Sequence, residues 1–386
     1  MNSGLRAQTF FAAVLALSGL IGGAVCAQSV NTRSKVIAPT HEPSGQAVVP
    51  SPYAGTRLVM PSTEAAALPN LQPPPSPTER TRVRPLPSEG AEWIDRIVKS
   101  ARELPYTGVF IQQTADGMST SRITHLVDRR GVELEKLEML DGPQTEIIRR
   151  NEEMFCYHPE AKTVRIDRRI SGRFFPSLIS SDSKNIAENY NVRLGNIERV
   201  AGFDCQWLIL QPKDAMRYMQ KLCAELSTGL LLRARLYNDR NQVLEQFMFT
   251  QLDLSRSVAK ISLRSQFEQL PGWQMTESTK PNNAAETGWR VANLPAGFKK
   301  VAEMIRTLVG RPTPVSQLVF SDGLSHVSVF VEQMQGAAQT SGARMTDDSP
   351  IAFAMRPVAD HQVTVMGEVP VAAVQAIADS VMQKGR

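Results

Sequence analysis

The sequence is poor in the residue types on which enzyme active sites most often depend. Its 386 residues include five histidines, four cysteines and only 6% aromatic residues. No cysteine and histidine group has zinc-ligand spacing, and no nucleophile-elbow, P-loop or H-E-x-x-H motif is present. His125, His158, His326 and His361 are far apart in the chain, and His41 lies in a proline-rich segment; we interpret each as a core or surface residue, although pairing in space stays open. We therefore expect no catalytic, cofactor or metal site, and favour a binding protein over an enzyme.

The chain also lacks a strong excess of one charge. Lys and Arg number 43 against 38 Asp and Glu. This balance does not predict nucleic-acid binding; it fits ordinary solvated charge, or a surface that meets an acidic partner or a phosphorylated lipid. The glutamates at positions 133, 135, 138, 152 and 153 have the spacing of solvent-facing strand and turn residues. A carboxylate pair for glycoside hydrolysis is not favoured, but the sequence alone leaves it open.

Long hydrophobic runs are absent except at the N-terminus. Residues 1–27 combine the basic Arg6 with a leucine- and alanine-rich stretch and the small-residue ending Val25-Cys26-Ala27. This pattern predicts a secretory signal peptide cleaved between Ala27 and Gln28. Cys26 would also fit a lipoprotein signal, but Val25 before it is a poor match. No other stretch approaches the 18 apolar residues of a membrane span, so we expect a soluble, exported protein.

Residues 28–89 contain 12 of the 25 prolines and almost no aromatic residue. Such a segment cannot bury enough apolar surface to offset its conformational entropy, so it predicts a disordered, proline-rich tether. The remaining length suffices for two domains. We place a large domain at residues 90–270, a polar linker at 271–288 and a small α+β domain at 289–386.

The stretch from Gly202 to Leu252 predicts four consecutive antiparallel strands. Alternation of apolar and polar residues between 230 and 237 is typical of a strand with one buried face. If the first hairpin is centred on Asp214, Cys205 and Cys223 face each other at a separation that suits a disulfide. Two buried thiols that never pair are the alternative. After leader removal three cysteines remain, so we expect Cys156 to be the unpaired one, buried as a small hydrophobe.

The rest of the large domain predicts a helix followed by short strands. Trp93, Ile94, Ile97, Val98 and Ala101 recur at helical spacing before Pro105. Strands are expected at 107–113, 121–128, 132–140, 145–150, 154–158, 163–167 and 191–200, with a loop and short helices at 172–189. The small domain should begin with a strand that ends at 294–295. Further strands are expected at 316–320, 327–333, 351–356 and 362–366, followed by a helix at 371–384. The fold class is thus α+β and mainly antiparallel β.

Twelve short segments of the two domains together match the pattern of one known family. They are YTGVF (106–110), SRITH (121–125), EKLEMLDGP (135–143), EIIR (146–149), CYHP (156–159), TGLL (228–231), LEQF (244–247), FTQL (249–252), LPAGF (294–298), FSDGL (320–324), VSVF (327–330) and VTVMGEVP (363–370). In these segments the chain resembles the MucB/RseB family, periplasmic negative regulators of the sigma-E (AlgU-type) envelope stress response. The resemblance covers nearly all of residues 90–384 in order, although the long proline-rich segment is not typical of the family.

This resemblance implies a large half-barrel domain similar to lipoprotein carriers of the LolA/LolB type and a small C-terminal domain. It implies a periplasmic protein that binds the periplasmic part of a single-span anti-sigma factor of the RseA/MucA type. Binding would shield that factor from the first regulatory protease, and lipid or lipopolysaccharide would be associated with release. We expect partner recognition to need the small domain and its junction with the large one; homo-oligomer formation stays open.

A lipid pocket, if present, should lie on the concave side of the sheet. We assign to it the apolar residues of two adjacent strands, which are Leu230, Leu232, Leu236, Phe247 and Phe249. The same residues could instead pack against the helix around Trp93 and Ile97. The alternative function is a periplasmic lipid or lipoprotein carrier, for which the small domain would have no evident use.

Overall fold

The computed structural model describes residues 87–168, 175–179, 183–255, 258–268, 271–277, 286–306, 313–334, 342–345 and 349–385. The predicted signal peptide, with Ala27 and Gln28, and residues 28–86 of the predicted tether lie outside these ranges. Helix α2 (Pro87–Glu103) begins three residues before the predicted tether ends, so that boundary is wrong. The fixed φ of proline and its missing N–H are tolerated in a first helical turn, which lets the helix start at Pro87.

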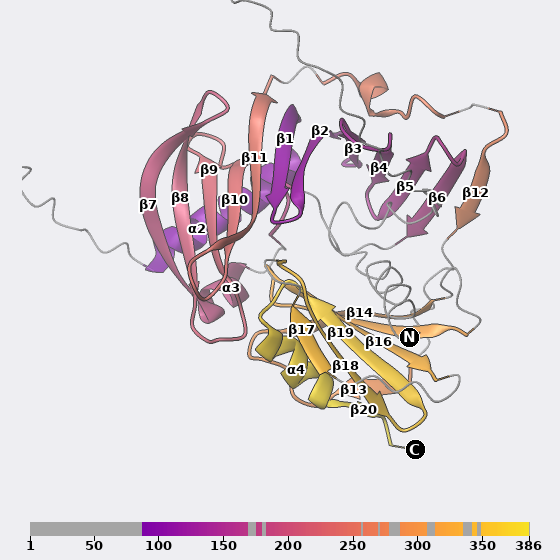
Figure 1. The fold of residues 1–386 in the computed structure, drawn as a ribbon. Coiled ribbons are helices and arrows are strands. Elements are labelled where there is room, and N and C mark those ends of the chain that lie inside the picture. Colours follow the sequence, from indigo (N-terminus) through magenta and orange to yellow (C-terminus); the bar gives the residue numbers. More distant parts are fainter. Residues whose placement is uncertain are drawn as a thin grey trace, which may run out of the picture. The chain divides into compact units, whose positions relative to one another are not determined.

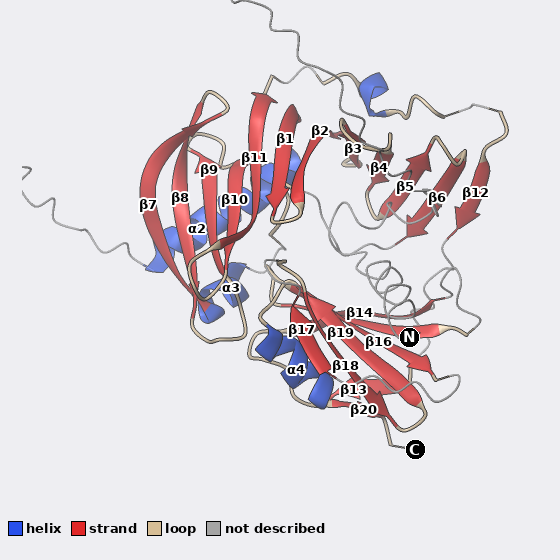
Figure 2. Cartoon of the chain, viewed as in Figure 1, coloured by secondary structure: helices blue, strands red, loops and turns tan. Residues whose placement is uncertain are grey.

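A twelve-stranded sheet contains most of the described chain up to Glu277 (Figures 1 and 2). Its order is β12-β6-β5-β4-β3-β2-β1-β11-β10-β9-β8-β7, and the strands at the two ends do not pair, so the sheet is open. Neighbouring strands are antiparallel except β6 and β12, which are parallel. The strands are β1 (Tyr106–Thr114), β2 (Gly117–Val127), β3 (Glu133–Met139), β4 (Glu146–Arg150), β5 (Glu153–His158), β6 (Thr163–Arg168), β7 (Tyr190–Val200), β8 (Phe203–Pro212), β9 (Met219–Glu225), β10 (Leu231–Tyr237), β11 (Val243–Asp253) and β12 (Gln274–Glu277).

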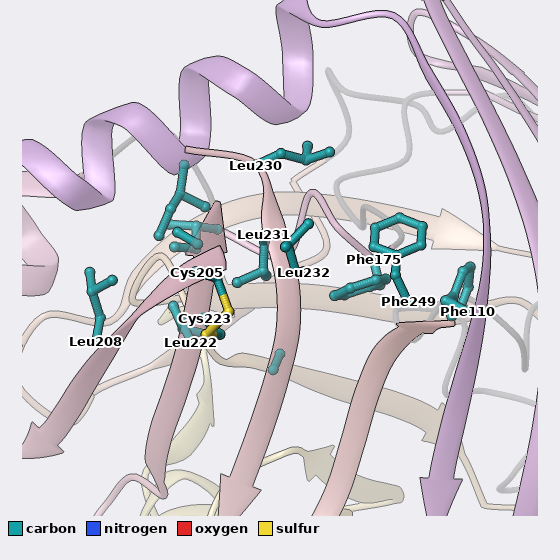
Figure 3. Close-up of a cluster of buried hydrophobic side chains, with 14 of the residues drawn as sticks. Phe110, Phe175, Cys205, Leu208, Leu222, Cys223, Leu230, Leu231, Leu232 and Phe249 are labelled. Carbon is teal, nitrogen blue, oxygen red and sulfur yellow. A yellow bond between two sulfur atoms is a disulfide. The ribbon is translucent and has the colours of Figure 1, made fainter. Parts of the chain in front are cut away.

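Helix α2 packs its apolar side on the core of this sheet. Ile94 and Ile97, three residues apart on one helical face, are fully buried and share a cluster with Leu208, Leu222 and other sheet residues (Figure 3). Arg96 closes the contact at the edge, where its guanidinium donates to the carbonyl of Leu226 at 2.7 Å. A second, short helix, α3 (Ser183–Asn189), leads directly into β7.

The remaining described residues form a six-stranded antiparallel sheet, a two-stranded sheet and helix α4 (Val371–Asp379). Ala373, Val374, Ile377 and Ala378 of α4 are buried in one cluster with valines of the larger of these two sheets. The strands are β13 (Trp289–Val291), β14 (Lys299–Arg306), β15 (Val315–Ser321), β16 (His326–Gln333), β17 (Gly342–Met345), β18 (Ala352–Val358), β19 (His361–Gly367) and β20 (Val381–Gln383). The predicted α+β, mainly antiparallel fold with a large sheet and a small C-terminal sheet is confirmed.

The structure contains a disulfide between Cys205 and Cys223, whose Cα atoms are 5.4 Å apart. The predicted pairing is wrong by two residues, which corresponds to a shift of the turn centre by one residue. Cys223 lies opposite Trp207 rather than Cys205, because the ladder is centred on Ala215 and not on Asp214. The carboxylate of Asp214 accepts a hydrogen bond from the N–H of Met216, so Asp214 starts the turn instead of occupying its middle. The two cysteines are therefore diagonal neighbours on one face.

Cys156 is fully buried, as expected, but it is itself disulfide-bonded. Its partner lies outside the described residues. The prediction of an unpaired thiol at Cys156 is therefore wrong.

Two segments after residue 270 differ from the predictions. The predicted linker at 271–288 contains β12, which the aromatic ring of Trp273 anchors by packing on Phe267 and Tyr157 at 5.5 and 6.0 Å between centroids; residues 278–285 of it lie outside the described ranges. The final helix ends at Asp379 instead of Lys384. The following residues form β20, because Val381 is buried and pairs with β13.

A bulge alters the alternation predicted for residues 230–237. The pairing of β10 with β9 shifts between Leu231 and Arg233, so Leu231 is fully buried and does not continue the polar face of Arg233 and Arg235.

Candidate functional site

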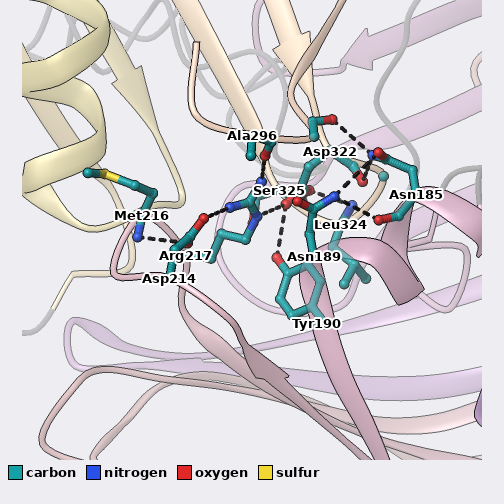
Figure 4. A network of polar contacts seen from close by, with 12 residues as sticks. Asn185, Asn189, Tyr190, Asp214, Met216, Arg217, Ala296, Asp322, Leu324 and Ser325 are labelled. Carbon is teal, nitrogen blue, oxygen red and sulfur yellow. Dashed lines mark hydrogen bonds and ion pairs between the residues drawn. The ribbon is translucent and has the colours of Figure 1, made fainter. Parts of the chain in front are cut away.

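A buried ion pair connects the large sheet with the C-terminal sheet. Arg217 lies in the turn between β8 and β9, and Asp322 lies in the turn between β15 and β16. The Nε of Arg217 donates to Oδ2 of Asp322 at 2.7 Å, and both side chains are 0% exposed (Figure 4). Charges removed from water are tolerated only when their geometry and remaining hydrogen bonds are satisfied. The pair therefore requires one specific contact between these two turns.

The carboxylate of Asp322 has hydrogen-bond partners on both oxygens. Its Oδ2 also accepts from the hydroxyl of Tyr190, the first residue of β7, at 3.0 Å. Its Oδ1 accepts from the backbone N–H groups of Leu324 and Ser325 at 3.0 and 2.8 Å. The side chain thus shapes its own turn with one oxygen and holds the large sheet with the other.

The guanidinium of Arg217 is equally well satisfied. It also donates to the carboxylate of Asp214 and to the carbonyl oxygen of Ala296. Its carbon lies 5.0 Å from the ring centroid of Phe298, which adds a cation–π contact. Arg217 therefore binds two separate segments that precede β14 and β16.

Helix α3 supplies a second set of contacts to the same segments. The side-chain amide of Asn185 donates to the carbonyl oxygens of Gly297 and Asp322 at 2.9 and 2.8 Å. Gly297 has φ +80, and a Cβ built on it would lie 2.1 Å from Nδ2 of Asn189. Only glycine fits here, since it both adopts the left-handed conformation and allows this close approach.

The electrostatics of this network fix the protonation of its members. Burial, and then the charge of Asp322, raise the pKa of Tyr190 well above its usual range, so the phenol remains neutral and donates its proton. Burial alone would lower the pKa of Arg217, but attraction to Asp322 and hydrogen bonds to Asp214 and Asp322 raise it. Burial lowers the pKa of the neighbouring His326, despite the opposing effect of Asp322.

Apolar side chains exchange across the same junction. Leu324, from the C-terminal sheet, is buried in the core cluster of the large sheet. Met216, from the large sheet, packs against the core cluster of the C-terminal sheet. Each sheet therefore completes part of its core with a side chain from the other, and we call the contacts of Asn185, Tyr190, Met216, Arg217, Gly297, Asp322 and Leu324 the junction.

Two carboxylates, one from the large sheet and one from the C-terminal sheet region, both have raised pKa values. Burial raises the pKa of Glu245 on β11 to about 7, although its hydrogen bond from Gln112 opposes this. Burial and the charge of Glu245 raise the pKa of Glu368, which follows β19, to about 8. Like charges in one buried place cannot both ionise readily, so the pair holds protons near neutral pH.

The five residues assigned to a lipid pocket do not form a single group. Leu230, Leu232 and Phe249 are buried in the large core cluster, and Phe247 packs on it. Leu236 belongs to a separate cluster with Tyr218 and Leu244. Phe175 stacks on Phe247 with 5.5 Å between ring centroids and lies 5.0 Å from Phe249 (Figure 3). The predicted pocket residues are thus contacted by other side chains of the protein, and the pocket stays a prediction.

The described residues contain no group of three or more His, Cys, Asp or Glu side chains arranged to hold a metal ion. Within the same ranges no helix has the length and apolar character needed to cross a membrane. None of the junction residues was predicted from the sequence as a site residue. Gly297 and Asp322 lie in the family-like segments LPAGF and FSDGL, and nothing in the local pattern of either segment indicates a partner more than a hundred positions away.

Family models and individual relatives of known function all match this chain to the same family. The family model described as the MucB/RseB N-terminal domain matches residues 89–267, and that of the MucB/RseB C-terminal domain matches residues 283–382. The sigma factor AlgU regulatory protein MucB of Pseudomonas aeruginosa is 30% identical over 297 residues, which cover 76% of this chain and 91% of that protein. The sigma-E factor regulatory protein RseB of Salmonella typhimurium is 28% identical over 308 residues, with the same coverage.

Two solved structures share the fold over their whole length. A complex of Pseudomonas aeruginosa MucA and MucB contains a chain 27% identical to this one, with a TM-score of 0.63; it covers 77% of this chain and 100% of that chain. A crystal structure of MucB in complex with MucA(peri) has the same identity and coverage and a TM-score of 0.62.

Proposed function

Because this chain belongs to the MucB/RseB family, we propose that it is a periplasmic regulator that binds the periplasmic part of a single-span anti-sigma factor. Binding shields that factor from the first regulatory protease and so keeps a sigma-E-type factor inactive. The observation that carries this proposal is the likeness, over 100% of the MucB chain, to a MucB structure in complex with MucA(peri).

The junction supports a role for both sheets in this binding. Asn185, Tyr190 and Arg217 of the large sheet region hold two turns of the C-terminal sheet region through hydrogen bonds and a buried ion pair. A peptide that contacts both sheets is bound only if their relative placement is fixed. We therefore propose that anti-sigma recognition depends on the junction.

We further propose that binding of a lipid releases the anti-sigma factor. An acyl chain that enters near Phe247 and Phe249 has to displace the ring of Phe175, which stacks there. A ligand shifts a conformational equilibrium only through unequal affinity for the two states. If displacement of Phe175 favours a different arrangement of the junction contacts, lipid and anti-sigma peptide must weaken each other's binding by the same factor.

A protection assay tests the main function. The periplasmic segment of a single-span anti-sigma factor of the RseA/MucA type is incubated with the first regulatory protease, with and without equimolar chain. The proposal predicts slower cleavage with the wild-type chain and weaker protection by the junction variant Asp322→Asn. Cleavage at an unchanged rate in the presence of wild-type chain contradicts the proposal. Binding of acyl lipids without any such protection would instead favour the carrier function.

The lipid part is tested separately by Phe247→Asp. A charge at this half-buried position should abolish binding of a fluorescent acyl probe, while Ile197→Asp, at an exposed position of β7, serves as the control. Unchanged probe binding by folded Phe247→Asp places the lipid elsewhere.

A further inference from the structure

A row of cationic side chains crosses the large sheet on the face opposite α2. In the ladders of β8, β9, β10 and β11, Lys221 lies directly between Ile209 and Arg235, and Arg235 pairs with Gln246 on its other side. Directly paired residues point to one face, and Arg233, two positions before Arg235, shares it. In Figure 1, α2 passes behind these strands and no described element lies in front of them.

The charges in this row are poorly compensated. The carboxylate of Glu198 accepts from Arg233 at 2.7 Å and from the indole N–H of Trp207 at 2.7 Å. The amide oxygen of Gln246 accepts from both Arg233 and Arg235. Among the described residues, these hydrogen bonds give Arg235 a neutral acceptor only, and no acidic side chain forms an ion pair with Lys221.

Aromatic rings hold the two unpaired cations in place. The guanidinium of Arg235 lies 5.6 Å from the centroid of Trp207, and the ammonium of Lys221 lies 4.6 Å from that of Tyr237. Both rings are largely buried. Cation–π contacts of this kind fix the position of a charge without neutralising it, so the donors that remain on Lys221 and Arg235 are ordered in advance of any ligand.

This arrangement works against the stability of the sheet. Like charges directly opposite on adjacent strands are destabilising. Burial lowers the pKa of Arg233, and the charge of the nearby Arg235 lowers it further, although Glu198 opposes both effects. A purely structural role would be filled better by neutral side chains of similar size, whereas an anion placed over the row would relieve the repulsion.

We propose that Lys221 and Arg235 form a binding site for a phosphate-type oxyanion on the uncovered face of β9 and β10. The two terminal nitrogens of Arg235 suit the parallel hydrogen bonds that a planar guanidinium makes to a phosphate, and Lys221 adds a point charge beside them. The oxyanion can be free phosphate or the headgroup of a lipid. Lys221 and Arg235 are not among the residues of the junction.

The test compares Arg235→Gln and Lys221→Gln with the matched control Arg199→Gln. Arg199 is an exposed arginine of the edge strand β7, and its replacement changes the net charge equally. Thermal unfolding is followed with increasing inorganic phosphate, with chloride at equal ionic strength as reference. In parallel, sedimentation measures binding to vesicles of phosphatidylglycerol and of phosphatidylcholine.

Wild type should bind one of the two probes, shown either by a phosphate-dependent rise in melting temperature or by binding to phosphatidylglycerol vesicles alone. Arg235→Gln should lower the affinity for that probe about tenfold, and Arg199→Gln should leave it unchanged. A response to phosphate identifies a free oxyanion, and a response only to phosphatidylglycerol identifies a headgroup. The proposal also expects both row variants to unfold at a higher temperature than wild type in chloride. No response to either ligand, or equal losses in Arg235→Gln and Arg199→Gln, overturns the proposal.

Discussion

Arg217 and Asp322 are 105 positions apart, yet they form a 2.7 Å ion pair in which neither side chain is exposed. A buried pair of this kind adds little net stability compared with a well-packed apolar pair, but removal of one partner leaves an uncompensated charge. Its effect is therefore to favour one placement of the two turns over all others. The reciprocal burial of Met216 and Leu324 makes the same placement favourable for the apolar cores.

The first prediction concerns this pair. Asp322→Asn should lower the free energy of unfolding by about 3 to 5 kcal/mol, because Arg217 is left charged in a buried place. Urea unfolding measures the change. Asp204→Asn is the control, since it removes a carboxylate that faces Arg199 at 4.0 Å with both side chains largely exposed, and it should cost less than about 1 kcal/mol. Equal effects of the two variants would contradict the role assigned to the buried pair.

The second prediction concerns the close approach at Gly297. Gly297→Ala should destabilise the chain more than Gly272→Ala, although both glycines have a φ near +80. The added Cβ at Gly297 meets Asn189, whereas that at Gly272 has nothing within 4 Å. Left-handed strain costs both variants about 1 kcal/mol, and crowding should add roughly 1 to 3 kcal/mol at Gly297 alone. The idea fails if the two alanine variants have the same unfolding midpoint.

Sequence patterns predicted most of the long strands, but not the eight-residue β14, and they were insufficient for the short ones. The alternation in β7 to β11 and the turn residues between them predicted these strands within a few residues. Strands β12, β17 and β20 are three or four residues long and were missed, because so short a segment has no readable period and depends on its pairing partner. Val381 shows the consequence: its helical pattern continues that of α4, but pairing with β13 prevails.

The site was less predictable than the fold for a related reason. Cys205 and Cys223 could be paired from their distances to one turn, and only the register was wrong. Arg217 and Asp322 each lie in a polar turn. Turns are usually exposed to solvent, so a charged residue in a turn does not by itself indicate a site. Their burial arises from contact between distant turns, and a single sequence carries no signal for such a contact.

The third prediction concerns the disulfide. Replacement of Cys205 and Cys223 by alanine together should lower the free energy of unfolding by about 3 kcal/mol, because a bond across 18 positions limits the unfolded chain. Peptide mapping of unreduced wild-type protein should recover the two cysteines in one linked pair. Full alkylation of both cysteines in denatured, unreduced protein would show that the bond does not form.

The fourth prediction follows from the raised pKa of Glu245. The carboxyl has an ordinary pKa of 4.5 when unfolded and about 7 when folded, so the folded state holds the proton more tightly. Its contribution to stability is present below pH 4.5 and is lost as the pH rises towards 7. Glu245→Gln should therefore reduce the loss of stability between these pH values.

Unfolding by urea at several pH values measures this effect, and Glu152→Gln, at an exposed turn, is the control. Glutamine can still accept the hydrogen bond from Gln112, which keeps the packing comparable. A pH profile of Glu245→Gln that parallels those of the wild type and of Glu152→Gln would contradict a proton held at Glu245.

The measurement that tests the central claim most directly is calorimetric titration of the anti-sigma periplasmic segment into this protein. Wild type and the exposed-pair control Asp204→Asn should bind it with a dissociation constant of about 1 μM or lower. Asp322→Asn, in conditions where circular dichroism shows it folded, should bind at least about tenfold more weakly, because the two sheets are no longer held in one placement. Absence of binding by the wild type contradicts the regulatory function, and equal binding by Asp322→Asn contradicts the role of the junction.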